Sequence, residues 1–188
     1  MIHSYPLFPT EVVHIRRPDD WEQRKVKLME LFKDNPEYHS VSYSFTDFFR
    51  NTDDFDYRKE FSYLMANELI EFNKATKKAF PEIEDLEMNH IWTQRYKRTE
   101  SMAPHSHGPR GFSGVLYVEF IKGEHEGTVL QGYSNNPITQ ELNQFIPDVQ
   151  EGDMIIFPSS MPHFANPSES DLSRTIMSFN LDIVYRKF

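Results

Sequence analysis

The chain has 188 residues, a length that favours one domain, and its 16 Phe, nine Tyr and two Trp supply large apolar side chains for a core. The formal net charge of −9, without a cluster of Lys and Arg, argues against binding to nucleic acids or to anionic membranes. The absence of cysteine excludes disulfides, zinc fingers, Fe–S clusters and thiol nucleophiles, and it is compatible with a reducing cytoplasm.

The first part of the chain has the periodicity of helices. Asp19 and Asp20 are N-cap candidates for a helix that Pro36 ends. Apolar residues at i, i+3 and i+4 spacing predict a second helix from about residue 57 to residue 80. We expect both helices to pack against a sheet and to carry no chemistry, and we interpret residues 1–85 as a helical support.

The stretch at 38–56 lies between these helices and is aromatic and acidic. This composition makes it a candidate lid or substrate-facing surface, because such elements are commonly loops. A solvated loop would have the same composition, so the sequence leaves both interpretations open.

The pattern changes after Pro81 to short segments rich in β-branched and aromatic residues, with Gly, Pro and Asn between them. Because no helical segment separates these stretches, they favour a sandwich or barrel over a βαβ fold. The expected fold class is therefore α+β, with an all-β core at 86–188 and flanking helices in one domain. The predicted strands are at 86–98, 112–121, 127–133, 153–157 and 174–185.

An H-x-H pair, His105 and His107, is the first candidate for chemistry. On a strand, residues i and i+2 project from the same face, so the two imidazoles could reach adjacent positions on one metal ion. Imidazole is a suitable ligand for iron, copper, zinc and nickel. The pair alone is a weak signal, since two surface histidines give the same pattern.

A third histidine, His163, follows an apolar strand at 154–157 and a tight, proline-bounded connection at 158–162. A histidine delivered by a buried strand and a rigid turn is well placed to complete a metal site, although an ordinary loop histidine would fit as well. The other five are expected to be surface or packing residues: His3, His14, His39, His90 and His125.

The last predicted strand begins with Arg174, whose guanidinium fork suits a carboxylate. The polar residues on its face suggest the lining of a cavity, and a solvated face on an edge strand is the alternative. The residues that alternation brings to this face are Arg174, Ile176, Ser178 and Asn180.

Together these motifs resemble the 2-oxoglutarate/Fe(II)-dependent oxygenases, with the closest likeness to oxygenases of phages and bacteria that are related to prolyl hydroxylases. The resemblance covers about 88–185 and, less specifically, 6–10. Its motifs are H-x-H at 105–107 and the segments 112–118, 152–158, 162–163, 174 and 178–180.

The resemblance implies a double-stranded β-helix, a jelly-roll or cupin-like barrel with a metal at one mouth. It implies that His105, His107 and His163 are the metal ligands and the catalytic centre, with Fe(II) and 2-oxoglutarate as cofactors and O2 as cosubstrate. Most of the superfamily has Asp or Glu at the position of His107, so this centre would carry one negative charge less.

The resemblance also assigns residues to the cosubstrate. Arg174 would bind the distal carboxylate of 2-oxoglutarate, with Tyr117 assisting. Tyr96 is a second candidate tyrosine, and Ser178 and Asn180 are further candidates for the pocket. Core packing is the alternative for both tyrosines.

The implied reaction is hydroxylation of an unactivated C–H bond in a peptide or small molecule, with release of succinate and CO2. We expect no nucleic-acid or membrane partner, no signal peptide and a cytoplasmic location, in the host if the chain is phage-encoded. The sequence leaves the oligomeric state open, with a homodimer as one candidate.

Two other functions remain open. A cupin-like dioxygenase or isomerase would also use three histidines, but the glutamate expected shortly after H-x-H is missing and Arg174 would have no role. A metal-stabilised binding module without catalysis is the second, because the carboxylate ligand is absent.

Overall fold

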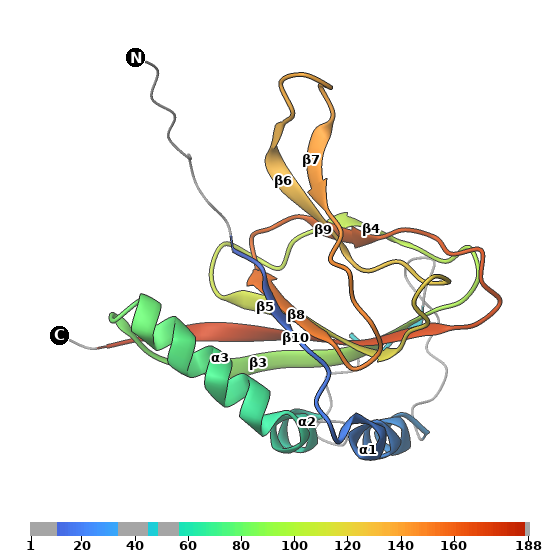
Figure 1. The fold of residues 1–188 in the computed structure, drawn as a ribbon. Coiled ribbons are helices and arrows are strands. Elements are labelled where there is room, and N and C mark those ends of the chain that lie inside the picture. The colour runs from blue at the N-terminus through green and yellow to red at the C-terminus, as the bar shows by residue number, and fades with distance from the viewer. Residues whose placement is uncertain (1–10, 34–44, 49–56, 187–188) are drawn as a thin grey trace.

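The computed structural model describes residues 11–33, 45–48 and 57–186. Most of the candidate lid at 38–56 lies outside the described residues, as does the segment at 6–10 that contributed to the resemblance. The described residues form two antiparallel sheets with helices on one side (Figure 1).

The larger sheet has the strand order β1-β8-β5-β10-β3-β2, and the smaller sheet has the order β4-β9-β6-β7. From β3 to β10 the chain passes back and forth between the sheets, interrupted only by the β6–β7 hairpin. This winding confirms the expected double-stranded β-helix. The larger sheet consists of β1 (Val13–Ile15), β2 (Phe45–Thr46), β3 (Ile83–Tyr96), β5 (Phe112–Glu119), β8 (Met154–Pro158) and β10 (Arg174–Tyr185). The smaller sheet consists of β4 (Met102–His105), β6 (Val129–Asn135), β7 (Leu142–Phe145) and β9 (His163–Ala165).

Three helices of the described residues cover the face of the larger sheet that points away from the smaller one (Figure 1). They are α1 (Trp21–Lys33), α2 (Arg58–Leu64) and α3 (Ala66–Ala79). The single helix predicted at 57–80 is wrong in one respect, because the backbone leaves helical geometry at Met65, with φ −109° and ψ 22°. Within the described part of the chain, no helix is both long enough and apolar enough to cross a membrane.

Strand β10 lies in the middle of the larger sheet, hydrogen-bonded to β5 on one side and to β3 on the other. Its side chains alternate as predicted: Met177 and Phe179 pack into the core cluster next to the helices, and Ile176 packs into the cluster between the sheets. The solvated edge strand considered from the sequence is therefore wrong. The face that begins with Arg174 points into the barrel.

The sequence did not predict the four strands β1, β2, β7 and β9, and it indicated β4 only as a strand that would carry H-x-H. These five strands have two to four residues each. Segments this short show too few alternations for a period to be recognised. Their hydrogen-bond partners lie elsewhere in the chain, as in the pairing of β1 with β8. Only the assembled sheets reveal them.

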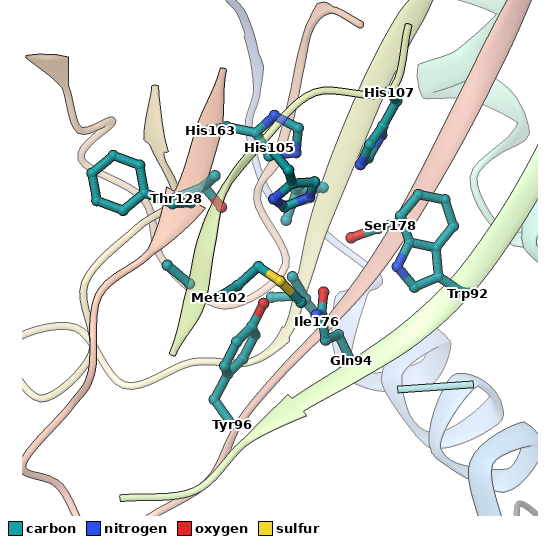
Figure 2. A pocket seen from close by; sticks show the side chains of 13 residues that line it. Trp92, Gln94, Tyr96, Met102, His105, His107, Thr128, His163, Ile176 and Ser178 are labelled. Carbon is teal, nitrogen blue, oxygen red and sulfur yellow. The ribbon is translucent and has the colours of Figure 1, made fainter. Parts of the chain in front are cut away.

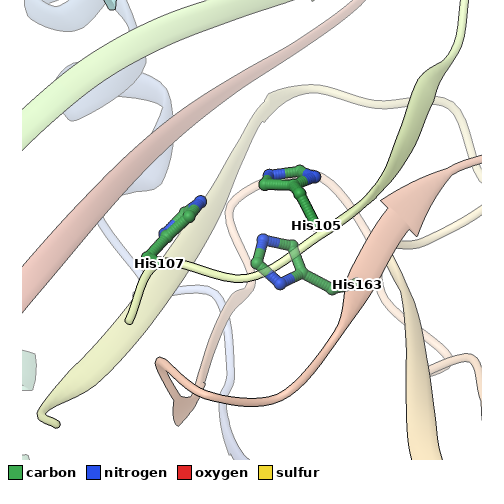
Figure 3. A group of neighbouring side chains, drawn as sticks. All are labelled: His105, His107 and His163. Atoms are coloured by element: carbon green, nitrogen blue, oxygen red, sulfur yellow. The ribbon is translucent and has the colours of Figure 1, made fainter. Parts of the chain in front are cut away.

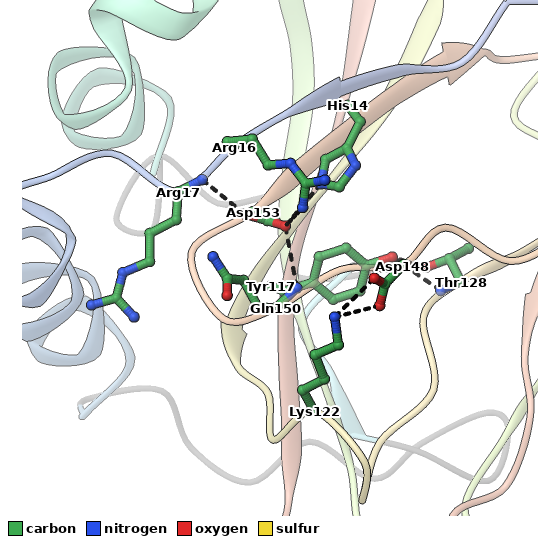
Figure 4. A network of polar contacts seen from close by, with 9 residues as sticks. All are labelled: His14, Arg16, Arg17, Tyr117, Lys122, Thr128, Asp148, Gln150 and Asp153. Carbon is green, nitrogen blue, oxygen red and sulfur yellow. Dashed lines mark hydrogen bonds and ion pairs between the residues drawn. The ribbon is translucent and has the colours of Figure 1, made fainter.

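The carboxylate of Asp153, a fully buried residue just before β8, joins β8 to the N-terminal strand (Figure 4). It accepts hydrogen bonds from the His14 ring at 2.8 Å, the Arg17 backbone N–H at 2.8 Å and the Gln150 backbone N–H at 3.2 Å. The Arg16 guanidinium lies 3.4 Å away. These contacts satisfy the buried charge and hold β1 against β8.

Candidate metal centre

The three candidate ligands reach the barrel mouth from two segments. His105 is the last residue of β4 and His163 is the first residue of β9, and the two are direct partners in the antiparallel register. His107 lies beyond the end of β4, in the loop that leads to β5. The prediction that both histidines of H-x-H share one strand is therefore wrong, because the strand ends between them.

The three imidazoles nevertheless converge (Figure 3). One ring nitrogen from each of His105, His107 and His163 lies within 4.8 Å of the others. The ring centroids are 4.4 Å apart for His105 and His163, 4.8 Å for His107 and His163, and 5.1 Å for His105 and His107. Nitrogens at these separations can bind one ion between them, so the geometry suits a three-histidine metal centre.

Hydrogen bonds at Nδ1 leave the Nε2 atom of each ring available as a ligand. The Nδ1 atom of His105 lies 2.8 Å from the Ala103 carbonyl oxygen, and that of His163 lies 3.0 Å from the Met161 carbonyl oxygen. A carbonyl only accepts, so both rings donate Nδ1–H and present an unprotonated Nε2. Such outer partners fix the tautomer and orientation of metal-binding histidines.

Burial keeps two of these rings neutral. It lowers the pKa of His163 to about 3, and it lowers the pKa of His107 below its ordinary value. The hydrogen bond from His163 to Met161 and that from His107 to Asn180 oppose these shifts, whereas the neighbouring imidazoles add to them. Both rings can therefore bind a cation at neutral pH without first losing a proton.

The rings border a small pocket inside the barrel (Figure 2). Its walls come from both sheets, and Tyr96 and Ser178, predicted from the sequence, are among them. Ile176, on the same predicted face as Ser178, lines it as well, whereas sequence reasoning missed the lining residues other than these and the three histidines. Two of them, Trp92 and Gln94, alternate with Tyr96 on β3, so the period of that strand could have identified them.

Arg174 is 4% exposed and has only part of its hydrogen-bonding capacity satisfied. Its Nη1 atom donates to the Glu126 carbonyl oxygen, whereas Nε and Nη2 are buried without a partner. The guanidinium carbon lies 4.3 Å from the centre of the Tyr96 ring. A buried cation with two free N–H directions is costly unless an anion completes it, so the group fits a carboxylate.

The two candidate tyrosines differ in position. Tyr96 lines the pocket, and burial raises its pKa to about 12 against the opposing effect of Arg174. Tyr117 is fully buried and its hydroxyl donates to Thr128 Oγ1 at 3.1 Å and accepts from the Thr128 N–H at 3.0 Å (Figure 4). Thr128, rather than Tyr117, borders the pocket, so direct assistance by Tyr117 stays a prediction.

Asn180, the last candidate from the sequence, contacts His107 and does not line the pocket. Among the histidines expected to have other roles, His14, His90 and His125 contact protein groups outside the cluster. His3 and His39 lie outside the described residues.

Comparison with known families agrees with the geometry. Residues 90–180 match the sequence model of a family described as "Putative 2OG-Fe(II) oxygenase", which confirms the resemblance seen in the motifs. No curated protein has significant sequence similarity to the chain.

Solved structures of low sequence identity share the fold. A prolyl-4-hydroxylase from Pseudomonas putida is 15% identical with a TM-score of 0.62, over 94% of this chain and 93% of that one. A viral collagen prolyl hydroxylase from Paramecium Bursaria Chlorella virus-1, in its 2OG complex, is 14% identical with a TM-score of 0.61, over 92% and 96%. The epimerase SnoN, in complex with Fe3+, alpha ketoglutarate and nogalamycin RO, is 12% identical with a TM-score of 0.64, over 94% and 81%.

Proposed function

We propose a function on the premise that this chain belongs to the 2-oxoglutarate/Fe(II)-dependent oxygenases, the family whose model its residues 90–180 match. The chain is an enzyme that uses Fe(II), 2-oxoglutarate and O2 to hydroxylate an unactivated C–H bond. Its substrate is a peptide or a small molecule, in keeping with the prolyl hydroxylases and the epimerase that share its fold.

One observation carries this proposal: three imidazoles with free Nε2 atoms and a buried, incompletely paired arginine lie in the same barrel. His105, His107 and His163 would hold the iron. The bound iron and 2-oxoglutarate supply the oxidising chemistry, in which 2-oxoglutarate is converted to succinate and CO2. The residues of the barrel orient both groups and exclude water from them.

Arg174 would bind the distal carboxylate of 2-oxoglutarate through its free Nε and Nη2. The Tyr96 ring beneath the guanidinium limits its movement and shields it from water. This arrangement favours an oxygenase over a cupin-like dioxygenase or isomerase, because a site without 2-oxoglutarate has no use for the unpaired cation. It also supports catalysis over a purely structural metal site.

The direct test is anaerobic addition of Fe(II) and 2-oxoglutarate to the purified protein. We expect a weak visible charge-transfer band, and slow release of succinate once O2 is admitted without substrate. A panel of proline-containing peptides and small molecules that raises succinate release would identify the substrate class. Absence of both the band and succinate would overturn the proposal.

Replacement of Arg174 separates binding of the cosubstrate from binding of the metal. In Arg174→Ala we expect about 100-fold weaker binding of 2-oxoglutarate, since a buried charge pair loses one partner, while Ni(II) affinity is unchanged. Arg174→Lys should recover only part of the loss, because an ammonium cannot form the two parallel bonds of a guanidinium. Isothermal titration in Ni(II) measures both constants.

The matched control is Arg98→Ala, which removes an exposed arginine that pairs with Glu169 and Asp171. It should bind 2-oxoglutarate as the wild type does. Equal affinity in Arg174→Ala and the wild type would assign the carboxylate to another cation and would favour the cupin-like alternative.

A further inference from the structure

His107 raises a question of positioning, because it lies past the end of β4 and no strand pairing orients it. Its backbone N–H donates to the Ser159 carbonyl oxygen at 2.9 Å. Its ring Nδ1 lies 2.9 Å from Asn180 Oδ1 and 2.9 Å from Ser113 Oγ. Both the main chain and the ring of His107 are therefore held by residues of the larger sheet.

Two of the three partners lie on adjacent strands of that sheet, and the third directly follows the neighbouring strand. Ser113 of β5 is the register partner of Asn180 of β10, and Ser159 directly follows β8. Ser113 Oγ lies 2.9 Å from Asn180 Oδ1 and 3.0 Å from Ser159 Oγ. With Ser113 1% exposed and Ser159 3% exposed, water does not compete for these bonds.

His107 differs in this respect from the other two ligands. His105 and His163 donate to backbone carbonyls, which a side-chain replacement does not remove. The Nδ1–H of His107 has only side-chain acceptors, of which the amide oxygen of Asn180 is the stronger. A single residue can therefore change the orientation and basicity of this ligand.

We propose that Asn180 is a positioning residue for the metal centre, and that Ser113 and Ser159 hold its amide in place. It fixes His107 as the Nδ1–H tautomer and directs Nε2 toward the other two imidazoles. His107 would thus serve as an imidazole ligand at the position where most related enzymes have a carboxylate. The inference rests on the proposed function, and it changes the role expected for Asn180 from pocket lining to support of His107.

Two replacements of Asn180 test the inference through the metal itself. Asn180→Leu removes the acceptor, and we expect Ni(II) to bind about 10- to 100-fold more weakly, as is usual when an outer partner of a metal-binding histidine is lost. Asn180→Asp keeps an acceptor in place and should bind Ni(II) at least as tightly as the wild type. Isothermal titration of the metal-free proteins measures both.

Asn180→Asp has a second, spectroscopic readout. An aspartate behind His107 makes the imidazole a stronger electron donor, so the anaerobic Fe(II)–2-oxoglutarate band should move to longer wavelength than in the wild type. A purely structural role of Asn180 would leave the position of this band unchanged. The matched control is Asn143→Leu, which removes an exposed amide on β7 that bonds Ser134; it should alter neither the affinity nor the band.

The tautomer can also be read without any replacement. In the metal-free wild type, long-range 1H–15N NMR correlations should report His107 as the Nδ1–H form, and an Nε2–H form would overturn the inference. This measurement tests the predicted tautomer of His107 even if Asn180→Leu fails to fold.

Failure of the inference and failure of the proposed function have different signatures. If the wild type binds no Ni(II) or Fe(II), the metal centre itself is refuted. If the wild type binds metal and Asn180→Leu binds it equally well, the centre stands and the role of Asn180 is refuted.

Discussion

Single side chains decide the charge of the candidate centre. His105, His107 and His163 have neutral acceptors at Nδ1, so three bound imidazoles would leave the full charge of a divalent cation uncompensated. Most relatives reduce that charge with one carboxylate. The carboxylate of 2-oxoglutarate would therefore be the first anion at this metal. Binding of the cosubstrate should depend strongly on the charge of the metal ion.

Burial of His163 predicts how the metal-free protein responds to acid. Its pKa is lowered to about 3 in the folded chain, and an unfolded histidine titrates near 6.5. Between these values the unfolded state binds the extra proton, so stability rises with pH and is lost as pH falls below about 6.5. The contribution of one such group is at most about 1.4 kcal/mol per pH unit.

Urea unfolding of the metal-free protein at pH 6.5 and pH 5.5 measures this dependence. His163→Gln removes the titrating ring at the same site and should show a smaller loss of stability between the two pH values. An equal loss in both proteins would mean that other groups dominate the acid response and that His163 is not neutral in the folded chain.

Individual strands carry the information that the sequence reveals most clearly. The strands predicted at 112–121 and 174–185 correspond to β5 and β10. Long strands rich in apolar residues can be recognised from the sequence itself. The position of His107 could not be predicted, since it depends on Ser159 and Asn180, which lie far along the chain. The three histidines do lie close together, as the H-x-H pair and His163 predicted, although the strand geometry used to argue it was wrong. Their role as metal ligands stays a prediction.

The carboxylate of Asp153 should stabilise the contact between strands β1 and β8. Asp153→Ala removes the acceptor shared by His14 and the backbone N–H groups of Arg17 and Gln150, and leaves these donors unpaired in a buried place. We expect the free energy of unfolding to fall by about 3 kcal/mol. Chemical denaturation measures the change.

Asp148→Ala is the control for this replacement. Asp148 is an exposed aspartate five residues before Asp153, and it pairs with Lys122 (Figure 4). Its removal should leave stability unchanged, because exposed ion pairs contribute little. If both replacements cost the same, the Asp153 network does not join the strands as described.

The whole barrel should respond to a bound metal, because the candidate ligands come from both of its sheets. His105 and His163 belong to the smaller sheet, whereas His107 is held by Ser159 and Asn180 of the larger one. An ion bound to all three bridges the sheets and binds only the folded state. The two proposed parts of the domain, a support at 1–85 and a core at 86–188, are themselves connected, since β1 of the first part pairs with β8 of the second.

Ni(II) at 100 times its dissociation constant should therefore stabilise the chain by about 2.7 kcal/mol. For a chain of this length, that corresponds to a rise in Tm of about 5–10 °C, which a chelator should reverse. Arg174→Ala should keep the metal-induced rise and lose the additional rise caused by 2-oxoglutarate. His163→Ala should lose both, because two imidazoles no longer form the centre. A rise of equal size in His163→Ala would mean that Ni(II) binds elsewhere on this acidic chain, and the bridge between the sheets would be refuted.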